Sequence, residues 1–483
     1  MNRRALLKHL LLFAAYGSIG VLLAAVVALV LVLGSRPDLE PWHTADLDEE
    51  FDRWSRLETL GEYLALEDRV FAQLEREVID QTGPARKFEL NRYKRGSASG
   101  PDHWPRNWNR TFEFHVAQPR GVALLIHGLS DSPYSMRWPA ASLQAAGVHV
   151  LGLRVPGHGT APSGLVTTGW RDMAAAVELA MADLARRFPD EPIFIVGYSN
   201  GAALAINYTL DALQDDDLAL PSRLVLIAPE IGVDPFAAFA IWQARLGHWL
   251  GMDKLAWNNL VPEFDPFKYG SFAVNAGHVA HRITNEIQAG IAEAAEAGTL
   301  ADMPPILAFS SVVDATVRAP DLVSRLFNPL PQGGHELVLF DINRAAGVEH
   351  LLRWQPDALL DALRAAVDQE YALTLVTNRS PTDLGVREVH LGFDVSVLDE
   401  QPLDLAWPRN VYSLSHVALG FPANDPLYGD GTTNDPSTVH LGNLALRGER
   451  GVLQISDTAM LRQRWNPFYP YLETRMLEFL GLD

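Results

Sequence analysis

A serine between two glycines at residues 197–201, in the order Gly-Tyr-Ser-Asn-Gly, is the strongest chemical signal in this chain. The apolar run 193–196 precedes it and a run of small residues follows, which predicts a strand, a tight turn and a helix. Such a turn holds a serine hydroxyl above a sheet. Gly197 and Gly201 are needed because side chains there would collide with the strand and the helix. Ser199 is therefore the candidate nucleophile.

A second motif offers backbone donors for a negatively charged intermediate. The apolar run 122–126 leads directly into the tripeptide His127-Gly128-Leu129. In acyl transfer, a backbone N–H at such a strand end acts together with the N–H of the residue after the nucleophile. We therefore predict an oxyanion hole formed by Leu129 and Asn200. His127 directly follows a buried strand, and we interpret it as a brace of this loop.

Three ordered motifs carry a resemblance to a known superfamily. They are Ile126-His127-Gly128, Arg154-Val155-Pro156-Gly157-His158-Gly159 and Gly197-Tyr198-Ser199-Asn200-Gly201. Together they are similar to the α/β-hydrolases, in particular to the monoglyceride lipase and lysophospholipase-like branch. The resemblance covers about residues 112–483 apart from two insertions. It implies a serine esterase or lipase that works through an acyl-enzyme, with a helical cap over the site. His158 in the second motif is interpreted as structural.

The resemblance also implies an acid and then a histidine after the serine. Residues 306–317 resemble the strand and loop that carry the family acid, which makes Asp314 the candidate. In this mechanism the histidine takes the Ser199 proton, the acid orients the imidazole, and water releases the acyl group. We expect no cofactor and no metal ion.

Three histidines after the acid are candidates for the base. His335 and His350 fall within the few tens of residues that relatives place between acid and base, but neither follows a strand and precedes a final helix. His416 does, because residues 410–415 are strand-like and a closing helix is expected over residues 467–480. We therefore predict His416 as the base, 102 residues after the acid, with His350 as the alternative.

These residues require a sheet with aligned strand ends. Further strands are predicted at the apolar runs 148–153, 224–227 and 306–309, with helical or mixed stretches between most of them. This alternation predicts an α/β fold with a mostly parallel central sheet flanked by helices. Residues 230–304 are too long for a simple connection, and we predict a helical cap there, with aromatic residues that either line an acyl pocket or pack the cap.

A second insertion is predicted at about residues 331–408. Its strand-like runs at 336–340, 374–377 and 388–393 can extend the sheet, and a helix is expected near 358–372. His390, within the third run, is interpreted as a surface-strand histidine.

The N-terminal region differs from the rest of the chain in its long uncharged, apolar run. Residues 10–33 carry no charge, and a helix of that length spans a hydrocarbon core of about 30 Å. Basic residues precede the run and mainly acidic ones follow it, so residues 1–35 are predicted to be a transmembrane anchor with the catalytic domain extracytoplasmic, on the periplasmic side in a bacterium. A cleaved export signal is the alternative. Residues 36–110 are predicted to be a helical connector, with an amphipathic helix over 47–78.

Composition excludes several classes of function. The chain has 39 basic and 59 acidic residues, a net charge of −20 that disfavours binding to nucleic acid. It has no cysteine, which excludes disulfides, thiolate metal sites and cysteine nucleophiles. The predicted partner is a small-molecule or lipid-like acyl ester. The alternatives are a peptidase or an acyltransferase on the same fold, or a catalytically inactive membrane-anchored binding module.

Overall fold

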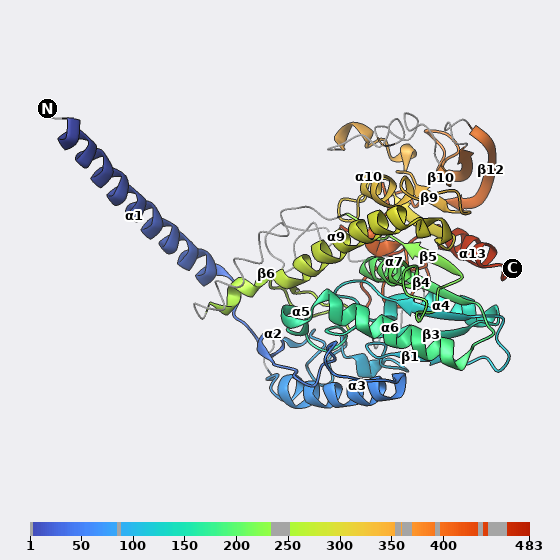
Figure 1. The fold of residues 1–483 in the computed structure, drawn as a ribbon, viewed down its shortest axis with the longest axis horizontal. Coiled ribbons are helices and arrows are strands. Elements are labelled where there is room, and N and C mark those ends of the chain that lie inside the picture. The colour runs from blue at the N-terminus through green and yellow to red at the C-terminus, as the bar shows by residue number, and fades with distance from the viewer. Residues whose placement is uncertain are drawn as a thin grey trace.

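A ten-stranded sheet forms the centre of the computed structural model, which describes residues 3–84, 88–232, 252–352, 359, 370–391, 397–432, 438–442 and 461–483. The strand order is β1-β3-β2-β4-β5-β8-β9-β10-β11-β12 (Figure 1). The strands from β3 to β10 in this order are parallel, whereas β1, β11 and β12 pair antiparallel. The strands are β1 (Phe112–Phe114), β2 (Val122–Ile126), β3 (His149–Leu153), β4 (Ile193–Tyr198), β5 (Arg223–Ile227), β8 (Ile306–Ser311), β9 (Glu336–Phe340), β10 (Ala372–Asn378), β11 (Gly385–Leu391) and β12 (Val397–Ala406).

Helices cover both faces of the sheet, and the predicted mostly parallel α/β fold is confirmed. Every residue of β2, β3, β4 and β8 is buried, as their continuous apolar runs predict. One face packs against α3 (Leu60–Leu74), α6 (Trp170–Arg187), α7 (Asn200–Ala212) and α9 (Val274–Ala297). The other packs against α4 (Arg137–Ala145) and α13 (Tyr469–Leu480).

The register of the central strands aligns their carboxyl ends. Ile126 of β2 lies opposite Leu153 of β3 and Gly197 of β4, and Tyr198 lies opposite Ile227 of β5. The loops that follow these strands therefore meet at one edge of the sheet, which is where ligands bind in open α/β sheets.

The prediction of a cap over residues 230–304 is wrong for the second half of this region. Residues 274–297 form α9, whose buried Ile283, Ile287 and Ile291 belong to the core that α6 and α7 share. α9 therefore belongs to a helical layer of the sheet. Its apolar residues recur at helical spacing, which does not distinguish a cap helix from a layer helix.

The first half of the same region contains a short hairpin of β6 (Trp257–Asn259) and β7 (Phe272–Ala273). Trp257 is 1% exposed and packs against His43, so this predicted cap aromatic fills a core. Residues 233–251, with the other two cap tryptophans, lie outside the described residues.

The predicted second insertion extends the main sheet. β9 lies between β8 and β10 as a parallel central strand, and β11 and β12 continue the sheet beyond them. The helix expected near residues 358–372 lies mostly outside the described residues. The prediction of a strand at 410–415 is wrong, because this segment is irregular. Separate hydrogen bonds from Ser311 and Asn343 hold it in place of the regular hydrogen bonds between paired strands.

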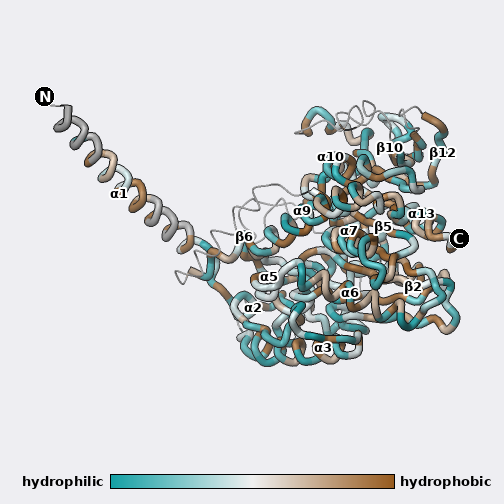
Figure 2. Tube along the Cα trace, viewed as in Figure 1, coloured by the Kyte–Doolittle hydropathy of each residue, from teal (hydrophilic) through white to brown (hydrophobic). Residues whose placement is uncertain are grey.

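The N-terminal apolar run lies within helix α1 (Arg3–Ser35), which extends away from the rest of the chain (Figure 1). Several of its apolar side chains are exposed, among them Phe13 and Tyr16. Figure 2 shows hydrophobic positions along this helix. Among the residues searched, which are those the structure describes, no helix combines the length and apolar character that crossing a bilayer requires. The predicted transmembrane helix is therefore not supported by the structure.

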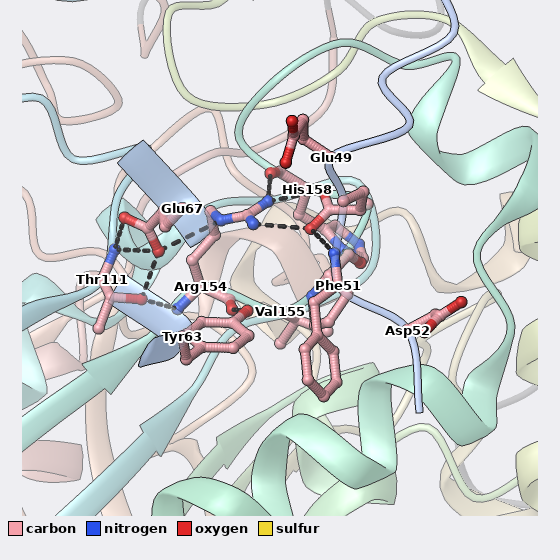
Figure 3. Close-up of polar contacts among 12 residues, drawn as sticks. Glu49, Phe51, Asp52, Tyr63, Glu67, Thr111, Arg154, Val155 and His158 are labelled. Carbon is pink, nitrogen blue, oxygen red and sulfur yellow. Dashed lines mark hydrogen bonds and ion pairs between the residues drawn. The ribbon is translucent and has the colours of Figure 1, made fainter. Parts of the chain in front are cut away.

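The predicted connector, residues 36–110, packs against the domain that contains the central sheet through a buried cluster of one arginine and two glutamates. Arg154, at the end of β3, donates to both carboxylate oxygens of Glu50, at 2.7 and 2.9 Å, and to Glu67 of α3 at 3.3 Å (Figure 3). Burial disfavours ionised Glu50, but the ion pair with Arg154 outweighs it and lowers the Glu50 pKa. The predicted helix over residues 47–78 begins only at Leu60, because Thr59 caps it through the Glu62 N–H.

Three further α-helices of the described residues are short. They are α2 (Pro41–Thr44), α5 (Gly164–Thr167) and α10 (Ala319–Leu322).

Candidate active site

Ser199 occupies the sharp turn between β4 and α7. Its backbone φ is +54° and its ψ is −115°, a conformation that L-residues rarely adopt. A Cβ atom on Gly201 would lie 2.1 Å from the Ile126 carbonyl oxygen, and one on Gly197 would lie 2.5 Å from Ala202 Cα. Both glycines are therefore sterically required, as predicted, and the strained turn is typical of a nucleophile elbow.

The loop after β2 passes beside this serine. A Cβ on Gly128 would lie 3.2 Å from the Ser199 Cβ, so only glycine allows the loop to approach this closely. Asn200 is the first residue of α7, and its N–H has no acceptor within the helix. Asn200 directly follows the nucleophile, and Leu129 directly follows Gly128 in the neighbouring loop. The oxyanion hole that they would form stays a prediction.

The two motif histidines make hydrogen bonds that position loops. His127 Nδ1 lies 2.9 Å from the Gly128 carbonyl oxygen, and its Nε2 accepts from the Val155 N–H at 3.0 Å. His158 Nδ1 lies 2.9 Å from the Pro156 carbonyl oxygen. Burial lowers the pKa of both rings, that of His158 to about 4, so both are neutral at pH 7. Both histidines therefore hold their loops in place, as predicted.

Asp314 lies in the loop after β8 and is buried. Its Oδ1 accepts hydrogen bonds from the Thr316 and Val317 N–H groups at 2.8 and 3.1 Å. The same oxygen lies 3.3 Å from His416 Nδ1, although 102 residues separate the two positions. Oδ2 is buried and has no hydrogen-bond partner among the described residues. The structure therefore brings the predicted acid and base together.

Hydrogen bonds from the ends of β4 and β8 and from the loop after β9 hold the segment that carries His416 at this edge. Ser311 Oγ donates to the Leu414 carbonyl oxygen at 3.0 Å, and Asn343 Nδ2 donates to that of Val411 at 2.8 Å. Tyr198, the residue before the nucleophile, donates from its hydroxyl to the His416 carbonyl oxygen at 3.2 Å. The chain thus returns from the second insertion to the carboxyl end of β9, and this return accounts for the long spacing.

The other candidate bases lie elsewhere. His335 Nδ1 accepts from the N–H of Ile306, the first residue of β8, so it lies at the opposite end of that strand from Asp314. His350 lies in an exposed turn, Glu349–Leu351. None of the contacts of the described residues joins either ring to Asp314. His390 pairs with Thr374 across β10 and β11, as expected for a strand histidine.

Arg462 is a site residue that the sequence did not reveal. Its Nη2 lies 2.9 Å from His416 Nδ1 and 3.3 Å from His416 Nε2. Among the described residues, no hydrogen bond joins Ser199 Oγ to His416, and the guanidinium contacts both ring nitrogens instead. No motif in the sequence marks Arg462.

Glu230 is a second unpredicted residue. It accepts a hydrogen bond from Asn200 Nδ2 at 3.0 Å, and its backbone N–H donates to the Ser199 carbonyl oxygen at 3.2 Å. Burial raises its pKa to about 7. The signal that could have revealed Glu230 in the sequence is its position, three residues after the end of β5, a buried parallel strand.

A cavity of about 440 Å³ opens beside these residues. Tyr198, Val417 and Arg462 connect it to the nucleophile elbow and to His416. The rest of its lining is mixed in polarity: Asp131, Asn259, Leu260, Val261, Phe264, Asp265, Lys268, Tyr269, Gly270, Phe421, Tyr428 and Arg464.

One group of potential metal ligands lies away from this cavity, on β1 and β3. Glu113, His115 and His149 place ligand atoms within 4.8 Å of one another. Arg187 pairs with Glu113, so a cation already occupies that carboxylate, and His149 Nε2 donates to the same oxygen at 2.6 Å.

Comparison with known proteins agrees with the motifs. Residues 117–316 match the family described as Hydrolase_4 (Serine aminopeptidase, S33). Over 88 residues the chain is 38% identical to the thermostable monoacylglycerol lipase of Bacillus sp. (strain H-257), a match that covers 18% of this chain and 34% of that protein. The chain thus spans about a third of the length of this curated relative.

The solved structures that the comparison matches to this chain include a monoacylglycerol lipase from Paleococcus ferrophilus. It shares 21% identity and a TM-score of 0.37 over 48% of this chain and 88% of that chain. A thermostable carboxyl esterase from Bacillus coagulans shares 16% identity and a TM-score of 0.37 over 53% and 93%. Together with the motifs and the parallel sheet, these matches confirm the resemblance: residues 117–316 are similar to the Hydrolase_4 family of α/β-hydrolases, and an 88-residue stretch is similar to a monoacylglycerol lipase.

Proposed function

We propose that this protein is a serine hydrolase that cleaves acyl esters. The observation that carries the proposal is the convergence of a strained serine with an acid–histidine pair at one edge of the sheet. Ser199 has a φ of +54° at the end of β4. His416, in the segment after β12, places its Nδ1 3.3 Å from Oδ1 of Asp314, in the loop after β8. This is the order and type of groups that acyl transfer through a serine requires.

In the proposed reaction, Ser199 Oγ attacks the ester carbonyl carbon while His416 accepts the hydroxyl proton. Asp314 stabilises the resulting imidazolium, and the Leu129 and Asn200 N–H groups stabilise the oxyanion. His416 then protonates the departing alcohol, which leaves an acyl-enzyme. Water, deprotonated by His416, attacks that acyl group and releases the acid and free Ser199. His416 makes both proton transfers, so the scheme needs no cofactor.

An ester series tests the proposal against its alternatives. We expect the full chain to hydrolyse p-nitrophenyl esters, and Ser199→Ala and His416→Ala each to lower kcat by 10³-fold or more. His350→Ala is the matched control and should keep the activity. An unaffected His416→Ala variant with an inactive His350→Ala variant would reassign the base. A folded chain without turnover of any ester would favour the binding-module alternative.

A peptidase is the second candidate, because the matching family is described as a serine aminopeptidase. Parallel assays with aminoacyl p-nitroanilides compare the two activities directly. Faster turnover of an anilide than of the matched p-nitrophenyl ester would favour the peptidase. An acyltransferase would be recognised by transfer of the acyl group to an added alcohol at the expense of hydrolysis.

The localisation is a separate proposal that rests on sequence alone. The uncharged run 10–33, with basic residues before it, supports attachment to a membrane with the catalytic domain outside the cytoplasm. Retention of the full chain in alkaline-washed membranes would support it, whereas recovery in the soluble fraction would contradict it. Protease digestion of intact cells or spheroplasts reports the side.

A further inference from the structure

The cavity beside His416 contains more positive than negative charge, in a chain whose net charge is −20. Three cationic side chains line it, Lys268, Arg462 and Arg464, against two carboxylates, Asp131 and Asp265. The net negative charge of the chain repels anions at long range. A preference of the cavity for anions must therefore arise from the charged side chains that line it.

Two of the cations already have acidic partners. Lys268 Nζ lies 2.7 Å from Asp131 Oδ1, and Arg464 Nη1 lies 4.0 Å from Asp265 Oδ2. Asp265 also accepts from the Tyr428 hydroxyl at 2.7 Å. Both carboxylates are thus committed to protein donors, and a substrate amine would have to displace one of these partners. This disfavours recognition of a cation in the cavity.

Arg462 differs from these pairs. It has no carboxylate within salt-bridge distance in the described part of the chain, and its hydrogen-bond contacts are the two ring nitrogens of His416. A guanidinium is always charged and presents a planar fork of donors that matches carboxylate and phosphate oxygens. The exposed Arg462 guanidinium, which has no carboxylate partner among the described residues, therefore has unused binding capacity.

The contact with His416 also conflicts with catalysis. Nδ1 lies 3.3 Å from Asp314 Oδ1 and 2.9 Å from Arg462 Nη2. One ring nitrogen cannot donate a proton to the carboxylate and accept one from the guanidinium at the same time. The role of His416 as base requires the first bond, so Arg462 needs another acceptor while the reaction proceeds.

We propose that Arg462 binds an anionic oxygen group of the substrate, a carboxylate or a phosphate, in the cavity beside His416. This inference rests on the proposed ester hydrolysis and names its substrate class. The substrate anion replaces the imidazole as the acceptor of the Arg462 N–H groups, and His416 is then free to donate to Asp314. The protein thus hydrolyses esters that carry a negative charge in preference to matched neutral esters.

Matched ester pairs test this substrate class. One arm compares 1-decanoylglycerol with 1-decanoylglycerol 3-phosphate, and the other compares p-nitrophenyl pentanoate with the p-nitrophenyl monoester of glutaric acid. The first arm places a phosphate on the alcohol and the second a carboxylate on the acyl chain. We expect kcat/KM for the anionic member of at least one pair to exceed that of the neutral member by about 10-fold, as a charge-assisted hydrogen bond allows.

The Arg462→Ala variant should reduce this ratio to about 1, and Arg462→Lys should retain part of it. Arg171→Ala, an exposed arginine of α6, is the matched control and should leave the ratio unchanged. Ratios of 1 or below in both arms of the unsubstituted protein, or a ratio that survives Arg462→Ala, would overturn the inference while ester hydrolysis itself stands.

A binding measurement separates this inference from the proposed function. Calorimetric titration of the Ser199→Ala full chain with 1-decanoylglycerol 3-phosphate requires no turnover. We expect binding that Arg462→Ala weakens about 10-fold, with 1-decanoylglycerol as the neutral comparison. Equal affinity for the two ligands would overturn the inference. Preserved binding of the phosphate in a protein without ester turnover would contradict only the proposed hydrolysis.

Discussion

Glu230 should make the stability of this protein fall as the pH rises through neutrality. Burial raises its pKa from an ordinary value of 4.5 to about 7. Its carboxyl accepts one hydrogen bond, from Asn200 Nδ2 at 3.0 Å, and no cation faces it in the described residues. Between pH 4.5 and about 7 the folded chain keeps a proton here that the unfolded chain loses, so unfolding becomes more favourable as pH rises.

The size of this effect follows from the pKa difference. One pKa unit corresponds to about 1.4 kcal/mol, so the ionised carboxylate lowers the free energy of unfolding by about 3 kcal/mol above pH 7. Glu230→Gln keeps the acceptor for Asn200 and removes the charge. We expect the variant to be about 3 kcal/mol more stable than the unsubstituted protein at pH 8.5 and equally stable at pH 4.5.

Urea unfolding of the full chain at these two pH values, followed by tryptophan fluorescence, measures the difference. Glu191→Gln, on the exposed loop before β4, is the control and should change stability equally little at both pH values. The reasoning fails if the stability gain of Glu230→Gln is the same at pH 4.5 and pH 8.5.

Three further substitutions test the elements that hold the site. Gly201→Ala places a Cβ 2.1 Å from a backbone oxygen and should lower stability by about 3 kcal/mol in thermal unfolding, whereas Gly61→Ala, with 3.9 Å of space, should be nearly neutral. Arg154→Met leaves Glu50 and Glu67 buried without their cation and should cost about 3–5 kcal/mol at pH 7 in urea unfolding, less at pH 4; an equal cost at both pH values would contradict the ion cluster. Asp314→Asn should lower kcat about 10³- to 10⁴-fold with little change in stability, and a retained kcat would remove it from the mechanism.

The features that local sequence determines were predictable. The sheet strands follow from continuous apolar runs, and the elbow at Ser199 follows from glycine spacing that steric contact enforces. Asp314 was found by its place after β8. His416 was found by its place before α13, although the insertion hid the usual distance to the acid.

The features that depend on tertiary packing were not predictable. α9 has the apolar spacing of any amphipathic helix, and only its burial against α7 shows that it belongs to the helical layer. The segment 410–415 has strand-forming residues, but single hydrogen bonds to Ser311 and Asn343 fix it outside the sheet. Arg462 reaches His416 across 46 residues of chain, and no local pattern encodes such a contact.

Covalent labelling of Ser199 tests the central claim most directly. The full chain is treated with a fluorophosphonate probe, and the modified residue is located by intact mass and peptide mapping. The account predicts one label, on Ser199, that is lost in Ser199→Ala and strongly slowed in His416→Ala but not in His350→Ala. A folded protein that stays unlabelled, or that carries the label on another residue, would contradict the proposed serine hydrolase.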